Sequence, residues 1–462
     1  MRSKTLCKKT GSLKLFGSIF FSLICGASGF AQEQVKPNII ILLTDDLGFG
    51  DIGCYYNVYA TPHIDRLATE GVMFTNYYTA APICSPSRAG LLTGISPAKL
   101  NFTTFLHTRK ANKAAEQADY LDTTVWSMAK LLRDHGYATA HYGKWHLGGG
   151  RDVTDAPNFD QYGFDDWAGT YESPAPDPLL TAADWIWSDQ DSIKRWNRTS
   201  YLIDKTLEFL AKNKDQPSFV NLWIDDVHTP WVPGDDSIGR YPTKPNEEKS
   251  FIAVLTELDK QVGRLMEGLQ ALGIDQNTLV IFTSDNGPMP NFRQDRSAGL
   301  RGSKLSLYEG GIRVPFIARW PQKIAKGRVD STSVLAAIDL LPSLSALAGI
   351  KVPQEIKQRF DGEDRSTALL EKASSRATTL FWEYGRSDTA FNFPQGRNRS
   401  PSLALREGHW KFLMNVDRSR PELYDLRTDS AENRNLVTQY PELVKRFGDL
   451  LINWRRSSYE DK

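Results

Sequence analysis

Apolar runs alternate with amphipathic patterns over most of the chain. Short apolar, β-rich runs are typical of buried strands, and they occupy residues 38–43, 137–143, 218–224 and 278–284. Apolar residues at helical spacing predict helices over residues 63–72, 125–136, 199–213 and 251–273. This alternation predicts an α/β fold, with a large mixed, mainly parallel sheet sandwiched by helices.

The pattern changes after about residue 377. Short strands separated by turns are predicted over residues 379–385, 402–408, 409–415 and 422–426, and a last helix over residues 441–456. Consecutive short strands of this kind indicate an antiparallel sheet. We therefore expect a larger N-terminal domain over residues 32–375 and a smaller C-terminal α+β subdomain over residues 376–462.

Residues 1–31 have the pattern of a secretory signal peptide. Five basic residues precede an apolar run, and small residues lead up to Ala31, where we expect cleavage. A membrane anchor is a weaker interpretation because the apolar run is short and interrupted by Gly and Ser. Lipidation of Cys25 is a further alternative, but Ile24 does not fit the small residue expected there. We expect a secreted or periplasmic protein without a membrane span.

Composition gives no reason to expect a polyanionic partner. The full chain has 56 basic and 55 acidic residues, and removal of residues 1–31 leaves 51 and 55, a formal charge of −4. We therefore expect neither nucleic acid nor an anionic membrane as a partner, and any anion binding must be local.

The expected mature chain retains only Cys54 and Cys84. A disulfide between them is one interpretation for an exported protein, although a chain of this length can bury a large core without one. Cys84 lies in the stretch PICSPSRAGLLTG, residues 82–94. The role of a thiol in this rigid Pro-Ser-Arg setting requires another explanation if it has no partner.

Two predicted strands end in matching polar pairs. Asp45 and Asp46 follow the first strand, and Asp285 and Asn286 follow the strand at 278–284. In doubly wound sheets, ligands bind outside the carboxyl ends of the strands. Three carboxylates at one place need a cation, and oxygen ligands suit Ca²⁺ or Mg²⁺. The alternative is that these residues only cap turns or helices, but two matching pairs favour a metal site.

Basic and imidazole side chains are expected near the same edge. Any one of them alone is as easily a surface cation or a hydrogen-bonded core histidine. Together around one thiol they predict a site for a tetrahedral oxyanion. The residues are Arg88, Lys144, His146, His228 and Lys304.

The stretch from Cys84 to Gly94 resembles the signature of the type I (formylglycine-dependent) sulfatases of the alkaline phosphatase superfamily. Residues 136–148, 283–287 and 301–315 resemble further blocks of that family, and the resemblance extends from about residue 36 to the end. In this family an oxidising maturation enzyme converts the cysteine into Cα-formylglycine (3-oxoalanine). The resemblance therefore implies that Cys84 is modified, and that such a maturation enzyme is a partner.

The resemblance also implies a metal site and a nucleophile. Asp45, Asp46, Asp285 and Asn286, with the residue formed from Cys84, would bind one divalent ion, usually Ca²⁺. The hydrated aldehyde at position 84 would attack sulfur through one hydroxyl, with the metal and Asp285 assisting.

The remaining residues receive roles from the same resemblance. Arg88 and Lys144 would hold the hydrate, and Lys304 would bind a sulfate oxygen. His228 would protonate the leaving oxygen, with Lys304 as a second candidate for this step, because an alkoxide is a poor leaving group. His146 would take the proton of the second hydroxyl, so that sulfate leaves and the aldehyde is restored.

The function implied is that of a sulfuric ester hydrolase that removes sulfate from a sulfated polysaccharide or oligosaccharide. Trp231, Trp382 and Arg397 are candidate substrate contacts, because aromatic faces suit sugar rings and a cation suits a second acidic group. Further candidates of the same kinds are Trp167, Tyr171, Tyr384, Arg386 and Arg399. Two alternatives stay open: a phosphate mono- or diester or phosphonate hydrolase of the same superfamily, and a non-catalytic glycan-binding protein.

Overall fold

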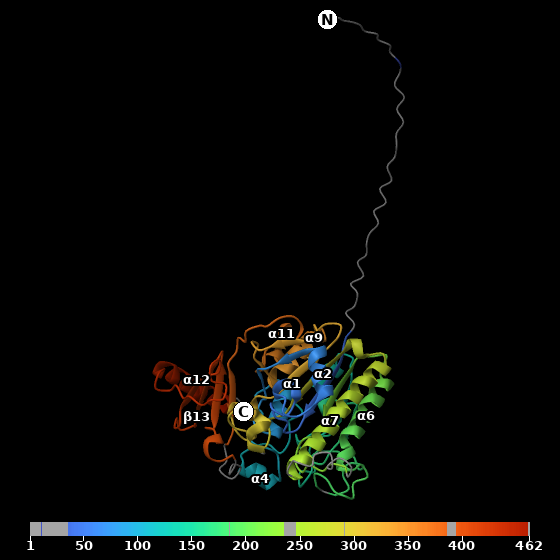
Figure 1. The fold of residues 1–462 in the computed structure, drawn as a ribbon, viewed down its shortest axis with the longest axis horizontal. Helices are drawn as coiled ribbons and strands as arrows, with labels where there is room; N and C mark the ends of the chain where they lie inside the picture. Colours follow the sequence, from blue (N-terminus) through green and yellow to red (C-terminus); the bar gives the residue numbers. More distant parts are fainter. Residues whose placement is uncertain are drawn as a thin grey trace. The chain divides into compact units, whose positions relative to one another are not determined.

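The large sheet has eight strands in the order β5-β4-β6-β1-β7-β8-β2-β9 in a computed structural model of the chain (Figure 1). The strands from β5 to β7 are parallel to one another, and β8 is antiparallel to both of its neighbours. The predicted mixed, mainly parallel sheet is thereby confirmed. The strands are β1 Asn38–Thr44, β2 Val72–Phe74, β4 Ala138–Gly143, β5 Asp166–Gly169, β6 Ser218–Trp223, β7 Thr278–Ser284, β8 Phe316–Arg319 and β9 Arg328–Asp330.

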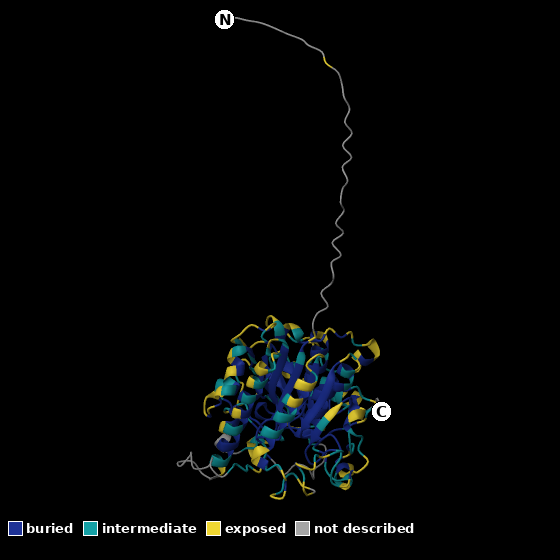
Figure 2. Cartoon of the chain, turned by 90° about the vertical axis from the view of Figure 1, so that its right-hand side faces the viewer, coloured by how far each residue is buried: buried dark blue, intermediate teal, exposed yellow. Residues whose placement is uncertain are grey.

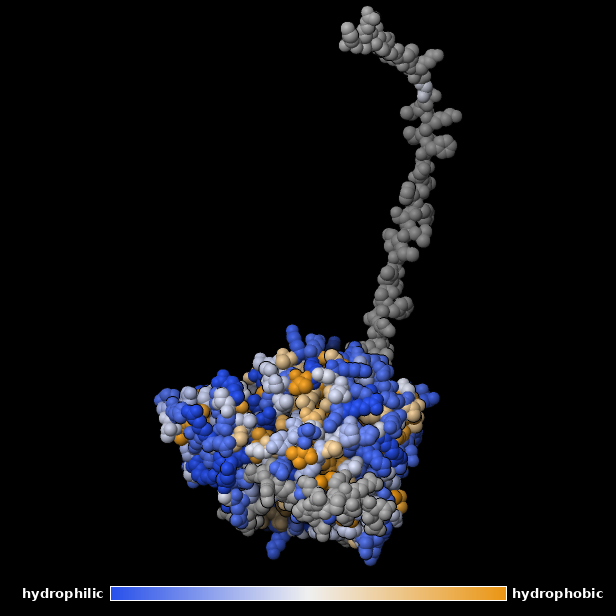
Figure 3. Space-filling model, in the orientation of Figure 1, coloured by the Kyte–Doolittle hydropathy of each residue, from blue (hydrophilic) through white to orange (hydrophobic). Residues whose placement is uncertain are grey.

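The structure describes residue 11 and residues 36–183, 185–234, 246–290, 292–385 and 394–460. The predicted signal peptide, apart from residue 11, lies outside the described residues. In the described part of the chain, no helix is long and apolar enough to cross a membrane. Hydrophilic residues cover most of the face shown in Figure 3.

Alternate residues of β1 pack on opposite faces of the large sheet, as the period of a strand requires. Ile39 and Ile41 belong to one buried cluster, and Ile40 and Leu42 to the other. Figure 2 shows the buried strands between helices that are partly exposed. The first face is covered by α3 Cys84–Thr93, α5 Met128–Arg133 and α9 Leu340–Leu347, and the second by α2 Pro62–Glu70, α6 Arg198–Lys212 and α7 Asn246–Ala271.

The predicted second sheet is also present. It is antiparallel in the order β11-β12-β13-β14, and α12 packs against it. Residues 36–462 form one compact unit, and the domain boundary between residues 375 and 376 stays a prediction. These elements are β11 Leu380–Glu383, β12 Leu403–Glu407, β13 Trp410–Met414, β14 Glu422–Asp425 and α12 Pro441–Glu460.

One helix is shorter than its apolar pattern predicts. The pattern covers residues 125–136, but α5 contains only Met128–Arg133. The side chain of Ser127 accepts a hydrogen bond from the backbone N–H of Lys130, which sets the start of the helix.

Shorter elements complete the fold. They are α1 Gly53–Tyr56, β3 Tyr77–Tyr78, α4 Arg109–Ala114, α8 Glu309–Ile312, β10 Leu335–Ala336, α10 Gln354–Lys357, α11 Ser366–Leu370, and the 3₁₀ turns Phe159–Tyr162, Arg195–Asn197, Asp275–Asn277, Phe292–Ser297, Ala337–Asp339 and Gly396–Asn398.

Candidate active site

The strand order brings the two predicted acidic pairs together. The strands β4, β6, β1 and β7 are consecutive neighbours and parallel, so their carboxyl ends lie at one edge of the sheet. The backbone N–H of Asp285, after β7, donates to the carbonyl of Thr44 at 3.1 Å. The backbone N–H of Asp46 lies 3.3 Å from Oδ1 of Asp285. The two strand ends therefore meet in one buried acidic cluster.

The helix α3 places Cys84 and Arg88 against this cluster. Cys84 is the first residue of the helix, and all ten residues of α3 are buried. Pro86 is tolerated because it lies in the first turn. Arg88 follows one turn later on the same face, and its Nε and Nη2 lie 2.9 and 2.8 Å from Oδ2 of Asp285. The thiol of Cys84 lies 3.4 Å from Oδ1 of Asp45.

Lys144 enters the site where β4 ends. Gly143 has a φ of 109°, and a Cβ on it would lie 2.0 Å from the carbonyl oxygen of Trp223 on β6. Only glycine allows the chain to turn this close to its neighbour. The turn directs Lys144 into the site, where Nζ lies 2.6 Å from Oδ2 of Asp45.

Lys304 and His228 face the second carboxylate. Lys304 Nζ lies 2.8 Å from Oδ2 of Asp46, and His228 Nε2 lies 3.7 Å from the same oxygen. The other ring nitrogen of His228, Nδ1, lies 2.5 Å from the carbonyl of Thr229. A carbonyl only accepts, so Nδ1 carries a proton and donates, and Nε2 is the nitrogen that faces the site.

His146 is oriented by a residue that the sequence does not single out. Its Nε2 lies 3.1 Å from the carbonyl of Leu106 and 3.4 Å from Oε2 of Glu172, so Nε2 is the protonated nitrogen. Its Nδ1 is buried and has no hydrogen-bond partner in the part of the chain that the structure describes. Arg151 Nη2 holds the Glu172 carboxylate at 2.8 Å. Burial lowers the pKa of His146 to about 4, although Glu172 opposes this shift, so the ring is a neutral base at Nδ1.

The electrostatics of the cluster are uneven. Burial opposes ionisation of Asp45, but Lys144 and His228 outweigh it and hold the pKa of Asp45 well below its usual value. Burial and the charge of Asp45 raise the pKa of Asp285 to about 6. Burial, with Asp45 next, raises the pKa of the Cys84 thiol well above its usual value. An unmodified thiol here would stay protonated and would be a poor nucleophile.

The donor set fits a hard divalent cation. Ligand atoms of Asp45, Asp46, Cys84 and Asp285 all lie within 4.8 Å of one another and are buried. Asn286 donates through Nδ2 to Oδ1 of Asp46 at 2.7 Å, whereas its buried Oδ1 has no hydrogen-bond partner among the described residues. A buried acceptor without a partner calls for an explanation. A cation held by oxygen ligands such as these would provide that partner.

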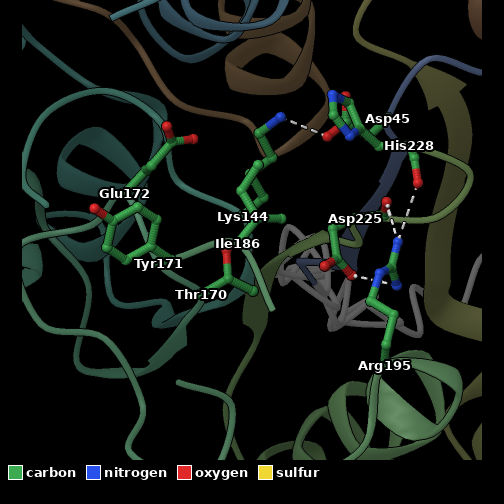
Figure 4. Close-up of a pocket in the computed structure, with 9 residues that line it drawn as sticks. All are labelled: Asp45, Lys144, Thr170, Tyr171, Glu172, Ile186, Arg195, Asp225 and His228. Carbon is green, nitrogen blue, oxygen red and sulfur yellow. Dashed lines mark hydrogen bonds and ion pairs between the residues drawn. The ribbon is translucent and has the colours of Figure 1, made fainter. Parts of the chain in front are cut away.

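A pocket opens beside these residues. In Figure 4, Tyr171 and Glu172 lie on one side of Lys144, with Asp45 and His228 on the other. Beyond Glu172, several lining residues were not singled out by the sequence. Thr170 and Ile186 lie outside any recognisable motif, whereas Asp225 follows β6 in a polar pair like those after β1 and β7. The pocket-lining residues are Asp45, Lys144, Thr170, Tyr171, Glu172, Ile186, Arg195, Asp225 and His228.

The predicted substrate contacts are dispersed. Trp382 is 2% exposed, and its Nε1 donates to the carbonyl of Thr79, which argues against contact with a sugar. Trp231 is half-buried and donates to Val227. Arg397 is exposed and contacts Asn433. Of the further candidates, Tyr171 lines the pocket, Tyr384 is buried, Trp167 packs against Phe159, Arg399 is exposed, and Arg386 lies outside the described residues.

The two cysteines of the described chain are both free, so the interpretation as a Cys54–Cys84 disulfide is not supported. Cys54 is partly exposed and its backbone N–H donates to Asp65. Cys84 is the only one of the two whose sulfur lies among the acidic cluster.

Comparisons with known proteins agree with this geometry. The sulfatase family model matches residues 37–350, and a model of the C-terminal region of N-sulphoglucosamine sulphohydrolase matches residues 303–456. An N-acetylgalactosamine-6-O-sulfatase of Bacteroides thetaiotaomicron is 30% identical, over 91% of this chain and 93% of that protein. The human N-acetylgalactosamine-6-sulfatase is 29% identical, over 92% of this chain and 88% of its own length.

Solved structures show the same fold. A structure from work on glycosaminoglycan metabolism by Bacteroides thetaiotaomicron has a TM-score of 0.74 and 28% identity, over 91% of this chain and 99% of that one. The protein Ps i-CgsB, solved in complex with k-i-k-neocarrahexaose, has a TM-score of 0.75 and 26% identity, over 92% and 94% of the two chains. From the matched family model and these relatives, we conclude that this chain belongs to the type I sulfatases of the alkaline phosphatase superfamily, hydrolases that act on sulfate esters.

Proposed function

We propose that this sulfatase removes sulfate from a sulfated carbohydrate, through a Cα-formylglycine formed from Cys84 and one bound Ca²⁺. The observation that carries the proposal is the position of Cys84, whose sulfur lies among three buried carboxylates while Lys144 and Lys304 reach the same carboxylates. Relatives named as N-acetylgalactosamine-6-sulfatases support a 6-O-sulfated N-acetylgalactosamine as the first sugar to test.

The two groups would supply distinct chemistry. A Cα-formylglycine at position 84 provides a hydrated aldehyde, with one hydroxyl for attack on sulfur and a second whose deprotonation restores the aldehyde. A Ca²⁺ held by Asp45, Asp46, Asp285 and Asn286 provides positive charge that favours ionisation of the attacking hydroxyl.

Side chains of this protein would stabilise the developing charge and transfer the protons. Arg88 and Lys144 would hold the hydrate at position 84, and Lys304 would bind a sulfate oxygen; such fixed positive charges stabilise the transition state. His228 lines the pocket and keeps its Nδ1 proton on the carbonyl of Thr229, so it would act in its imidazolium form and pass the second proton, on Nε2, to the leaving oxygen. His146, with its free Nδ1, would accept the proton of the second hydroxyl.

The proposal is tested by sulfate release from defined sulfated oligosaccharides. The enzyme is produced together with a formylglycine-generating maturation enzyme and compared with its Cys84→Ala variant. We expect release from 6-O-sulfated N-acetylgalactosamine oligosaccharides by the first protein only. Faster hydrolysis of an aryl phosphate than of an aryl sulfate would favour the phosphatase alternative, and glycan binding without turnover would favour a non-catalytic role.

The location of this activity belongs to the same proposal. The predicted signal peptide with cleavage near Ala31 would export the enzyme to the periplasm or the medium, where sulfated polysaccharides occur. N-terminal sequencing of the protein recovered outside the cytoplasm tests this step, and an intact residue 1–31 segment would contradict it.

A further inference from the structure

The pocket beside the acidic cluster has limited room. Its empty space, counted together with the open solvent at its entrance, is about 340 Å³. A space of this size cannot hold several sugar rings. The next ring of an oligosaccharide must therefore lie outside, against the residues at the mouth of the pocket.

Trp185 lies at this mouth. Its side chain is 52% exposed, and the following residue, Ile186, lines the pocket. The indole lies 6.5 Å from the ring of Tyr171, a second lining residue. The guanidinium of Arg151 lies 5.6 Å from the indole centroid and is held by Glu172, a third lining residue. The contacts with Tyr171 and Arg151 thus tie an exposed indole to the pocket wall.

The loop that carries Trp185 is firmly anchored. The buried guanidinium of Arg198 donates to the carbonyl of Ile186 at 2.8 Å and to that of Leu180 at 2.7 Å. The same guanidinium is paired with the buried carboxylate of Asp191 at 2.9 Å. A buried ion pair therefore fixes the backbone on which an exposed aromatic ring is mounted, as a preorganised binding surface requires.

The exposed apolar side chains of the protein are not scattered evenly. Of the eight large ones in the described part of the chain, Leu179, Trp185 and Trp196 fall within 18 residues. The same segment contains two pocket-lining residues, Ile186 and Arg195. Of these three exposed side chains, Trp185 contacts the lining residue Tyr171, which makes it the candidate for a binding surface beside the pocket.

We propose that Trp185, oriented by Arg151, is a stacking platform for the sugar ring next to the sulfated one. The ligand class is a pyranose of the glycan chain, whose C–H face packs on the indole. This inference rests on the proposed function, because it assumes that the sulfated group in the pocket belongs to a carbohydrate. It adds that the enzyme prefers an oligosaccharide to a sulfated monosaccharide.

The test compares Trp185→Ala with the parent enzyme on three substrates: nitrophenyl sulfate, a sulfated monosaccharide and the corresponding tetrasaccharide. We expect kcat/KM for the tetrasaccharide to fall about tenfold, mainly through KM, with little change for the two small substrates. Trp185→Phe should retain most of the activity on the tetrasaccharide, since it keeps an aromatic face.

A matched control is Tyr440→Ala, which removes an aromatic side chain of 42% exposure that packs on Trp410. It should leave all three substrates unaffected. The stacking role would be wrong if Trp185→Ala lowered kcat/KM equally for the small and large substrates. It would also be wrong if kcat/KM for the tetrasaccharide did not fall. A parent enzyme that cleaves nitrophenyl sulfate but no sulfated saccharide would instead overturn the proposed function, and the platform with it.

Discussion

Two of the buried clusters of charged residues differ in whether a ligand can reach them. The first is the acidic cluster of the candidate active site. In the second cluster, Lys411 of β13 lies 2.9 Å from Glu309 and 3.0 Å from Glu432, and all three side chains are fully buried. The hydroxyl of Tyr78 donates to Oε2 of Glu309 at 2.6 Å, and the backbone N–H of Glu309 donates to Oε2 of Glu432 at 2.6 Å. This cluster joins the small sheet to the segment around α8.

The acidic cluster at the strand ends is arranged differently. The Oδ1 of Asn286 has no hydrogen-bond partner among the residues described, and Lys144 and His228 line an open pocket. Buried charge alone therefore does not identify an active site, since both clusters have it. Access for a ligand distinguishes the first cluster, because Lys144 and His228 line a pocket, whereas the second cluster holds two parts of the protein together.

The largest expected effect is a loss of turnover when the proposed nucleophile at position 84 is removed. Stability should hardly change. Cys84→Ala should lower turnover by about 10⁴–10⁶-fold, as loss of a nucleophile does, while the free energy of unfolding changes by about 1 kcal/mol. Peptide mass spectrometry of the parent enzyme should show a residue at position 84 that is lighter than cysteine and resists alkylation. A fully active protein with an unmodified thiol would contradict this assignment.

Metal removal should have the next largest effect. Exhaustive chelation should reduce activity by about 10²-fold or more, because the ion is assigned several kcal/mol of charge stabilisation, and Ca²⁺ should restore it. Asp46→Asn keeps the side-chain volume but removes one charge, so it should weaken Ca²⁺ binding measured by calorimetry. Full activity in the demonstrably metal-free enzyme would rule out this role.

The two histidines should respond differently to the leaving group. Loss of a general acid costs about 10²–10⁴-fold, so His228→Ala should lose this much on a sulfated sugar and much less on nitrophenyl sulfate, whose alcohol leaves without a proton. His146→Ala should lose similar activity on both and should release a burst of alcohol. The same loss for His228→Ala on both substrates would show that the roles are wrong.

A change in the second cluster should affect stability instead of chemistry. Lys411→Met leaves two buried carboxylates without their cation, so urea unfolding should show a loss of about 3–5 kcal/mol, while the folded fraction keeps its kcat. Lys260→Met is the control, because Lys260 is 69% exposed and pairs only with Glu257 in the described structure; it should cost about 0–1 kcal/mol. A lower kcat of the folded Lys411→Met variant would contradict this and would indicate that the second cluster takes part in catalysis.

The smallest loss of turnover is expected for a change at Glu172, which contacts His146 and is assigned no contact with the reacting sulfate group. Glu172→Gln should lower kcat about tenfold, since it loosens the orientation of the imidazole and keeps the ring itself. The loss should be equal for sugar and aryl sulfates, because His146 acts after the alcohol has left. A loss confined to KM would indicate that Glu172 binds substrate instead.

The sequence by itself determined the elements and the residue types of the site. Apolar runs predicted the strands β1, β4, β6 and β7 and the small antiparallel sheet, and apolar residues at helical spacing predicted the helices. Both patterns arise because one or both faces of each element are buried. The motif at Cys84 and the polar residues after each strand predicted the catalytic set. These signals are local, so they are visible in one stretch of chain.

Only the tertiary structure decided which elements are neighbours. The order β4-β6-β1-β7 follows from packing between distant segments, and it alone brings Asp45 to Asp285 and Lys144. Glu172 and Trp185 lie in loops without a motif, and their roles depend on what folds against them. Trp382 lies in a strand that the sequence predicts, but only the tertiary structure shows that its ring is buried where the small sheet packs on Thr79. Contacts between residues far apart in the chain depend on how whole faces of sheets and helices pack together, and no local sequence pattern predicts that packing.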